Sequence, residues 1–326
     1  MRVLVTGATG FTGGHLARAL AARGYEVLAL VRDRQRGSEL AAAGVTLVAG
    51  DLRDVSTWRA ALTGVDVVHN TAALYRRAAP SDAVYRRVNA LAVEDLVTGA
   101  ADAGVRRVVH CSTVGVHGHV EQPPADEDAP LRPGDVYQQT KVEGERLARE
   151  AAARAGIELT IARPSGIYGP GDRRLLKLFR GVVRRRFVIL GDGRIFYHLA
   201  YIDDVVEGLR LCGEVAGAAG RTYILAGEHA PTLNELVALI AEEAGVRPRG
   251  VHLPVWPVWM LGAVCEALCR PLGVEPPLYR RRVDFFTKSR AFRIDRARRE
   301  LGFAPAVNLR EGIRRTLAWY NEHGWM

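Results

Sequence analysis

Short apolar runs that alternate with Ala-rich stretches constrain the fold of this 326-residue chain more than any other feature. The first half contains the runs "RVLVTG", "EVLALV", "VTLVAGD", "DVVHNTAA" and "RRVVHCST", and helical patterns such as 14–23 and 84–103 lie between them. Strands that alternate with helices predict a parallel sheet covered on both faces. Near-continuous apolar strands agree, because such strands are buried on both sides. We therefore expect an α/β fold with a doubly wound, mostly parallel sheet.

A glycine-spaced loop follows the first apolar run and opens the first helical stretch. The segment "VTGATGFTGGHL" places Gly7, Gly10 and Gly13 in the spacing G-x-x-G-x-x-G. Small residues let the backbone turn tightly and approach a pyrophosphate, whose charge is favoured by the N–H groups and dipole of a helix N-terminus. Since the loop lies between a strand and a helix, it predicts dinucleotide binding by a Rossmann sheet. A plain tight turn is the alternative.

The end of the second apolar run bears on which dinucleotide binds. A carboxylate there would accept a hydrogen bond from the ribose 2′-hydroxyl of NAD, whereas an arginine accommodates the 2′-phosphate of NADP. Arg32 follows the run directly, so we favour NADP, and NAD stays possible because Asp33 comes next. Asp51 and Leu52, after the third run, are expected beside the adenine ring.

The composition argues against several other classes of protein. The formal charge of +9 suits an anionic partner. However, the basic clusters are scattered and accompany no helix-turn-helix, zinc-finger or RNA-binding signature, so we expect no nucleic-acid partner. The four cysteines suit neither a disulfide framework nor a zinc site, so we expect no metal.

Two segments bear on localisation. The strand-like start "MRVLVTG" leaves no room for a signal peptide. The apolar stretch 251–269 contains two prolines and Glu266 and falls short of a membrane span. We expect a cytoplasmic protein in which 251–269 is a helix of a second lobe and lines an apolar pocket.

The stretch "YQQTK" places Tyr137 and Lys141 four residues apart on an expected helix, so that both side chains share one face. Lysine occurs elsewhere only at 177 and 288, although Lys and Arg together number 45. A nearby ammonium favours the phenolate and lowers the pKa of a tyrosine, which suits general acid–base catalysis. An ordinary surface pair is the alternative.

The dinucleotide loop, the pair Ser112-Thr113 and Tyr-x-x-x-Lys occur in an order that resembles the extended short-chain dehydrogenase/reductase family, the NAD(P)-dependent epimerase/dehydratase superfamily. The resemblance covers most of the chain and includes "GDL" at 50–52, "NTAA" at 70–73, "RPSGIYGPGD", "YIDDVVEG" and the C-terminal segment. It implies an enzyme in which Tyr137 gives or takes the proton and Lys141 holds the nicotinamide ribose. Thr113 would then hydrogen-bond the reacting oxygen, with Ser112 as the alternative to it.

The strand ends, the basic residues and the resemblance together give candidates for contacts to cofactor and substrate. The cofactor-binding candidates are Gly7, Thr9, Gly10, Phe11, Thr12, Gly13, Arg32, Asp51, Leu52, Thr71, Ala72, Ala73, Asn89, Tyr137, Lys141 and Pro164. The substrate candidates are Gly166, His198, Arg281 and Arg282.

Departures from the family patterns bear on the reaction. Sugar-nucleotide dehydratases carry Asp-Glu directly after the active-site Thr, where this chain has Val114 and Gly115. Nucleotide-sugar epimerases use an Asn at the position of Gly166 and an Arg at that of Tyr197. The segment "RPSGIYGPGD" and the apolar stretch 251–269 look more like the 3β-hydroxysteroid dehydrogenase and dihydroflavonol reductase side. We expect an oxidoreductase that interconverts a ketone and a secondary alcohol. An NAD-dependent nucleotide-sugar epimerase and, more remotely, a non-catalytic dinucleotide-binding sensor or scaffold are the alternatives.

The regular alternation of strands and helices fades after residue 165. We expect 1–165 to form the dinucleotide-binding Rossmann domain and 166–326 to form mainly a smaller substrate-binding lobe, with 196–224 returning to the sheet domain. A small-molecule substrate follows from this arrangement, and the family resemblance implies a homodimer.

Overall fold

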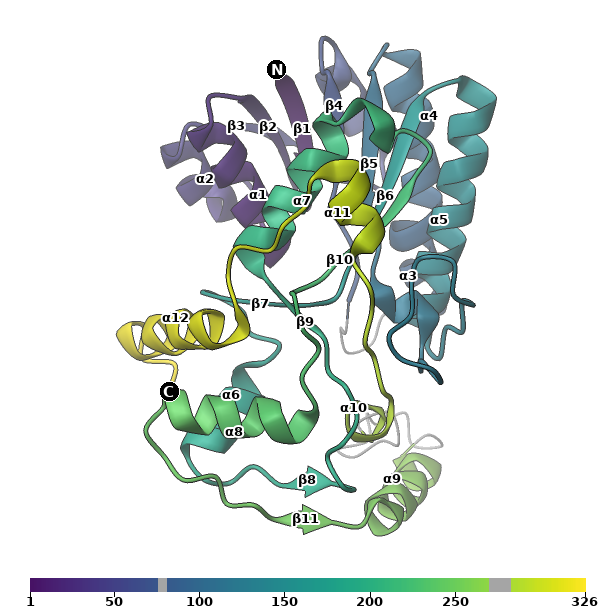
Figure 1. Ribbon diagram of the computed structural model, residues 1–326. Coiled ribbons are helices and arrows are strands. Elements are labelled where there is room, and N and C mark those ends of the chain that lie inside the picture. The colour runs from purple at the N-terminus through teal and green to yellow at the C-terminus, as the bar shows by residue number, and fades with distance from the viewer. Residues whose placement is uncertain (76–80, 270–282) are drawn as a thin grey trace.

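The computed structural model describes residues 1–75, 81–269 and 283–326, and a seven-stranded parallel sheet organises its larger domain (Figure 1). The expected doubly wound Rossmann sheet is confirmed. Its first six strands have the order 3-2-1-4-5-6, and a seventh strand is added beyond the sixth. Across the sheet the strands are β3 Thr46–Ala49, β2 Glu26–Val31, β1 Arg2–Thr6, β4 Val67–Asn70, β5 Arg107–Cys111, β6 Glu158–Pro164 and β10 Thr222–Leu225.

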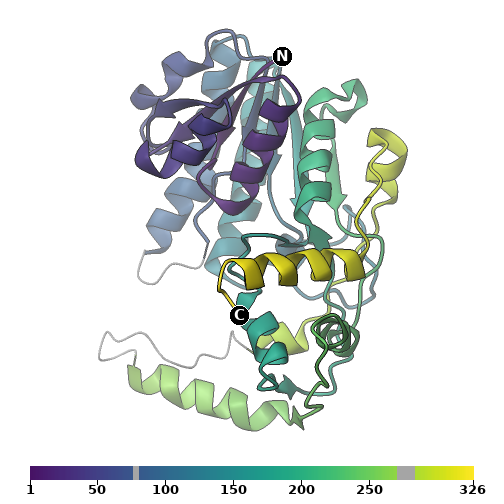
Figure 2. The same cartoon turned by 90° about the vertical axis from the view of Figure 1, so that its left-hand side faces the viewer.

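Helices cover both faces of this sheet. Helices α1 Phe11–Ala22 and α7 Ile202–Glu214 pack against each other on one face, while α4 Ala92–Asp102 and α5 Val136–Ala155 cover the other (Figures 1 and 2). The strands bury both of their faces, as the apolar runs predicted: Val3 and Val5 join the core cluster that includes α1 and α7, and Leu4 joins the cluster that includes α4 and α5. The remaining short elements of this domain are α2 Ser38–Ala42, α3 Asp82–Arg86 and the helical turns Gln35–Gly37, Val55–Thr57, Arg59–Leu62, Arg87–Leu91, Val114–His117 and Ala216–Ala218.

A smaller lobe lies beyond the carboxyl edge of the sheet (Figure 1). It contains two parallel strand pairs, β7 Gly166–Tyr168 with β9 Leu199–Tyr201 and β8 Ile189–Leu190 with β11 His252–Leu253. Its helices are α6 Leu176–Val183, α8 Leu233–Glu243, α9 Val255–Cys269, α10 Asp284–Thr287 and α12 Leu309–Glu322. Helix α11 Asp295–Leu301 returns to the sheet domain, where it packs against α7 and β10.

Helix α9 departs from the expectation for 251–269. Only Gly262 of this helix is buried, and its large apolar side chains are 43% to 70% exposed at Trp256, Trp259, Met260, Leu261, Val264 and Leu268. The expectation that the whole stretch lines an apolar pocket is therefore wrong, and only its first residues border a small cavity. Among the described helices, α9 included, none is both long and apolar enough to cross a bilayer.

A buried ion pair ties α5 to the sheet. The Arg163 guanidinium on β6 donates to both carboxylate oxygens of Glu145 on α5, at 2.9 and 2.7 Å, and both side chains are at most 4% exposed. Arg163 also donates to the carbonyl oxygen of Glu127 at 2.9 Å. Bidentate geometry and these additional bonds compensate the cost of burying the two charges.

We predict that Glu145→Ala lowers the free energy of unfolding by about 3–5 kcal/mol, because it leaves the Arg163 guanidinium buried without its counter-charge. Chemical denaturation measures the effect. The matched control is Glu150→Ala on the same helix, which removes an exposed pair with Arg146 and should cost less than about 0.5 kcal/mol. Equal losses in the two variants would contradict the structural role of the buried pair.

Candidate active site

The loop between β1 and α1 has the geometry that a pyrophosphate requires. Gly7 has a φ of +71°, and a Cβ there would lie 2.7 Å from backbone atoms of Ala72. A Cβ on Gly13 would lie 2.5 Å from both the Gly7 carbonyl oxygen and Thr71 Oγ1. Gly10 precedes α1 and provides no side-chain cap, so the first-turn N–H groups of this helix present an anion site. These residues fit a dinucleotide at the site that the sequence predicted.

Gly13→Ala should weaken dinucleotide binding tenfold or more, because the added methyl must displace the Gly7 carbonyl or Thr71. Such overpacking typically costs about 1–3 kcal/mol. Calorimetric titration with NADPH and NADH measures the effect. Gly217→Ala is the control, since a Cβ there meets nothing within 4 Å. An unchanged affinity in Gly13→Ala would contradict the proposed loop geometry.

The residues expected near the adenosine half lie beyond β2 and β3. Arg32 follows β2 with an exposed side chain. Asp51 pairs with Arg53 at 2.6 Å, and this hydrogen bond, assisted by the charge of Arg32, lowers the pKa of the Asp51 carboxyl. Leu52 is buried at 7% exposure. The Asp51–Arg53 pair was not foreseen, because Arg53 belongs to no motif.

Thr113 and Tyr137 are placed by the ends of β5 and α5. Thr113 caps the turn Val114–His117, where its Oγ1 accepts from the Gly115 N–H at 3.0 Å, and this leaves its hydroxyl proton to donate to another oxygen. Asp135 caps α5 two residues before Tyr137. The neighbouring Ser112 is buried, and its hydroxyl faces the Glu145 carboxyl, whose pKa it helps the Arg163 guanidinium to lower.

Tyr137 and Lys141 do not interact as the sequence suggested. Lys141 is fully buried, and its Nζ donates to the Cys111 carbonyl oxygen at 2.8 Å and lies 3.3 Å from His110 Nε2. Burial lowers the pKa of Lys141 to about 8, and burial also raises the pKa of Tyr137 above its usual range. The expectation of a lowered phenol pKa is therefore wrong. Tyr137 remains protonated at ordinary pH and is available as a proton donor.

Asn89 lies beneath the site in a π-helical turn, Arg87–Leu91, that interrupts the helix expected over 84–103. Its amide is completely buried: Oδ1 accepts from the Leu74 N–H at 2.8 Å, and Nδ2 donates to the Leu74 carbonyl oxygen and to Thr140 Oγ1, each at 3.1 Å. The structure thus shows Asn89 holding the loop after β4 against α5. That loop carries Thr71, Ala72, Ala73 and Tyr75, whose ring packs edge-on against Tyr137 with centroids 4.8 Å apart.

The structure places the residues expected to contact substrate in different surroundings. His198 Nε2–H donates to the Gly227 carbonyl oxygen at 2.9 Å, and Nδ1 accepts from the Phe292 N–H at 3.2 Å. Both ring nitrogens are occupied, so the substrate role expected for His198 is corrected to a structural one. Gly166 begins β7, where a Cβ would meet Leu199 at 2.9 Å. Pro164, a cofactor candidate, ends β6, whereas Arg281 and Arg282 lie outside the described residues.

The sequence did not single out Arg174, which the structure places beside the start of α1. Asp172 holds the Arg174 guanidinium at 2.8 Å, and the guanidinium carbon lies 5.1 Å from the ring centroid of Phe11 at the start of α1. A positive charge is thus fixed beside the dinucleotide loop. The only available signal was its position two residues after Asp172, the last residue of "RPSGIYGPGD".

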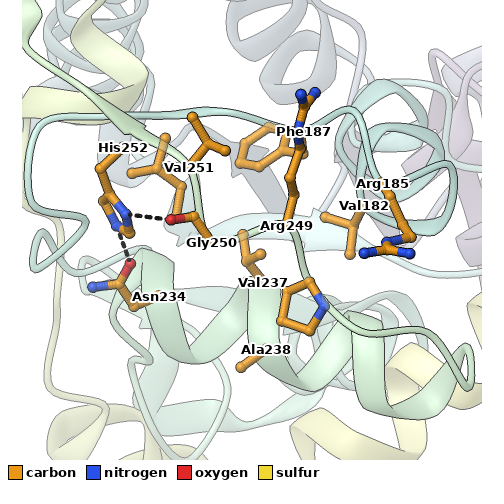
Figure 3. Close-up of a pocket in the computed structure, with 12 residues that line it drawn as sticks. Val182, Arg185, Phe187, Asn234, Val237, Ala238, Arg249, Gly250, Val251 and His252 are labelled. Carbon is orange, nitrogen blue, oxygen red and sulfur yellow. Dashed lines mark hydrogen bonds between the residues drawn. The ribbon is translucent and has the colours of Figure 1, made fainter.

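A small cavity lies apart from these residues (Figure 3). Its volume is about 110 Å³, below the roughly 300–1,000 Å³ of typical ligand pockets. It is lined by residues of α8, the end of α6 and the segment 248–252. No predicted catalytic residue borders it, so it does not mark the active site.

The chain is similar to known proteins along most of its length. The sequence profile of the NAD dependent epimerase/dehydratase family matches residues 3–226. A 4-hydroxy-2-methyl-3-oxo-4-farnesyl-3,4-dihydroquinoline-1-oxide ketoreductase of Stigmatella aurantiaca is 31% identical, over 96% of this chain and 95% of the relative. A 2-alkyl-3-oxoalkanoate reductase of Stenotrophomonas maltophilia is 30% identical, over 98% and 99%.

A solved structure shares the architecture. The dTDP-glucose 4,6-dehydratase DesIV of Streptomyces venezuelae, with NAD bound, aligns with a TM-score of 0.80 at 28% identity, covering 100% of this chain and 98% of that protein. The same fold therefore occurs with ketone-reducing and sugar-dehydrating relatives.

Proposed function

This chain belongs to the NAD-dependent epimerase/dehydratase family of extended short-chain dehydrogenases/reductases, and we propose that it is an oxidoreductase that interconverts a ketone and a secondary alcohol on a largely apolar molecule. It is an NAD(P)-dependent enzyme of that family. The observation that carries the proposal is Tyr137 at the start of α5, which burial keeps protonated, and the hydroxyl proton that Thr113 has free to donate supports it.

The proposed reaction assigns separate tasks to these side chains. The nicotinamide cofactor supplies or accepts the hydride when it is bound. Thr113 donates a hydrogen bond that polarises the substrate carbonyl, and Tyr137 transfers its phenolic proton to the oxygen as negative charge develops there. Oxidation follows the same geometry in reverse, with Tyr137 receiving the proton. Lys141 orients the cofactor ribose in this proposal.

The choice of reduction over the other family reactions rests on two supports. Val114 and Gly115 supply no second acid–base pair after Thr113, and dehydration of a sugar nucleotide would need one. Two relatives at 30–31% identity are reductases of ketones on molecules with farnesyl or alkyl chains. A nucleotide-sugar epimerase would instead keep its NAD through a complete internal cycle. Near-stoichiometric NAD released from freshly purified, denatured protein would therefore argue against the proposed reaction.

Tyr137→Phe should lower kcat by at least about 100-fold, because it removes the proton donor. Dinucleotide affinity should stay within about threefold, because the ring and its packing on Tyr75 remain. Steady-state oxidation of NADPH with a panel of steroid, aromatic and alkyl ketones measures the first quantity, and calorimetry measures the second. Tyr25→Phe is the control, because Tyr25 immediately precedes β2, at the amino end of the sheet, whereas the site lies at the carboxyl end. Substantial turnover by Tyr137→Phe would refute the assignment.

We further propose a preference for NADP, supported by the exposed Arg32 at the end of β2. Arg32→Ala should weaken NADPH binding about tenfold or more and leave NADH binding nearly unchanged, since only NADPH carries the 2′-phosphate. Competitive calorimetric titrations give both constants, with the exposed Arg247→Ala as a control. Equal effects on the two dinucleotides, or tighter NADH binding by the unmodified chain, would count against this preference.

The roles of the two parts of the chain and the oligomeric state are also proposals. We propose that residues 1–165 bind the dinucleotide and that 166–326 mainly shape the substrate site. A homodimer is expected from the family resemblance, and analytical ultracentrifugation tests it.

A further inference from the structure

A row of polar side chains crosses the buried interior from the end of β1 to α5. Its members come from four elements, and each is 0% exposed: Thr6 on β1, Asn70 on β4, His110 on β5 and Lys141 on α5. Thr6 Oγ1 lies 2.6 Å from Asn70 Oδ1, Asn70 Nδ2 lies 3.1 Å from His110 Nδ1, and His110 Nε2 lies 3.3 Å from Lys141 Nζ. The dinucleotide loop is thereby connected to Lys141 through three adjacent strands.

The direction of the hydrogen bonds at the first link follows from the partners of Thr6. The Ala72 N–H donates to Thr6 Oγ1 at 3.3 Å, which leaves the Thr6 hydroxyl proton to donate elsewhere. A separation of 2.6 Å suits an O–H···O bond and is short for an amide donor. Thr6 therefore donates to Asn70 Oδ1, and the Asn70 amide presents its N–H to His110.

The next two links set the state of the imidazole. A nitrogen that accepts from Asn70 carries no proton, so the one proton of neutral His110 is on Nε2. Burial holds the pKa of His110 well below its usual range, so the ring is neutral. The Nε2–H group then faces Lys141 Nζ. An ammonium has only donors and cannot accept this hydrogen bond, whereas a neutral amine has the lone pair to do so.

Burial, which lowers the pKa of Lys141, outweighs the charge of Glu145, which raises it. The titratable groups around Lys141 are His110 and Cys111 on β5 and, on its own helix, Tyr137 and Glu145. The Cys111 thiol has a pKa raised by burial and is uncharged, and Glu145 is already bonded to Arg163 and Arg149. The charged residues of α3, the π-turn and α4 form pairs at or near the surface, as in Arg86–Glu143, Arg87–Asp95 and Arg154–Glu94.

We propose that His110 is a positioning residue that donates its Nε2–H to Lys141 and thereby favours the neutral amine of Lys141 in the cofactor-free enzyme, with Thr6 and Asn70 fixing the tautomer. This inference rests on the proposed function, because it concerns the same Lys141. Above a pH of about 8 the amine is neutral and adds no charge that would favour the phenolate of Tyr137.

The chain makes a direct test possible because it contains only three lysines. With ¹³C at the lysine Cε atoms, each resonance reports loss of a proton from its own amine, and Lys177→Arg and Lys288→Arg assign the other two without touching the site. In the cofactor-free protein, we expect Lys141 to titrate near pH 8. A midpoint at the ordinary value near 10.4 would overturn the proposal.

The decisive comparison is Thr6→Val against Thr6→Ser. Valine removes the donor that orients Asn70, so the amide can turn, His110 can move its proton to Nδ1, and Nε2 can accept from an ammonium. We expect the Lys141 midpoint to rise by about one pH unit or more, a tenfold change in the protonation equilibrium, in Thr6→Val and to stay unchanged in Thr6→Ser. If the Thr6 hydroxyl had only a structural role, the Lys141 midpoint would be the same in Thr6→Val and Thr6→Ser. That result would overturn the proposal.

A measurement on the unmodified chain covers the case in which Thr6→Val does not fold. The imidazole ¹⁵N shifts of His110, identified by their loss in His110→Gln, should show the proton on Nε2, and a proton on Nδ1 would overturn the proposal. Both readouts use cofactor-free protein and no turnover. Failure here is therefore distinguishable from failure of the proposed oxidoreductase activity, which Tyr137→Phe tests separately.

Discussion

The buried ion pair between Arg163 and Glu145 is the interaction on which the geometry of the site depends. Tyr137, Lys141 and Glu145 are spaced four residues apart and lie along one face of α5. The bidentate contact fixes the rotation of that helix about its own axis, so it determines where the two reactive side chains point. Close approach adds a second constraint, because a Cβ on Gly144 would lie 2.2 Å from the Asn89 carbonyl oxygen. The rotation of α5 and its distance from Asn89 are thus both set by residues other than Tyr137 and Lys141.

Much of the sheet domain could be predicted from the sequence, because its signals are local. Apolar runs buried on both faces, and glycines between a strand and a helix, are properties of a few consecutive residues. The same holds for the four-residue spacing of Tyr137 and Lys141. The polar environment of Lys141 could not be predicted, since His110 lies 31 positions away and no local pattern indicates that the two side chains meet. The raised pKa of the Tyr137 phenol has the same origin, because burial depends on long-range packing.

The smaller lobe shows the opposite balance between local and long-range information. Histidine is a common binding residue, yet the ring of His198 is hydrogen-bonded to two backbone segments that lie 29 and 94 positions away in the sequence. The apolar stretch 251–269 predicted a helix correctly, but apolarity alone does not distinguish a side chain that is buried from one that is exposed. Residues of α9 are apolar around the whole circumference, so the sequence contains no preferred buried face to read.

The polar row beneath the sheet edge has a consequence for how this site can change through evolution. A hydrogen-bond chain specifies donor and acceptor at every link, so a substitution at one position alters what is acceptable at the next. The effects of substitutions at Thr6, Asn70, His110 and Lys141 should then be non-additive, as expected for residues that share one network. Relatives that lack the histidine at this strand position are under no requirement to keep the asparagine or the threonine. These positions would therefore be inherited as a set, even though the first and the last lie 135 positions apart.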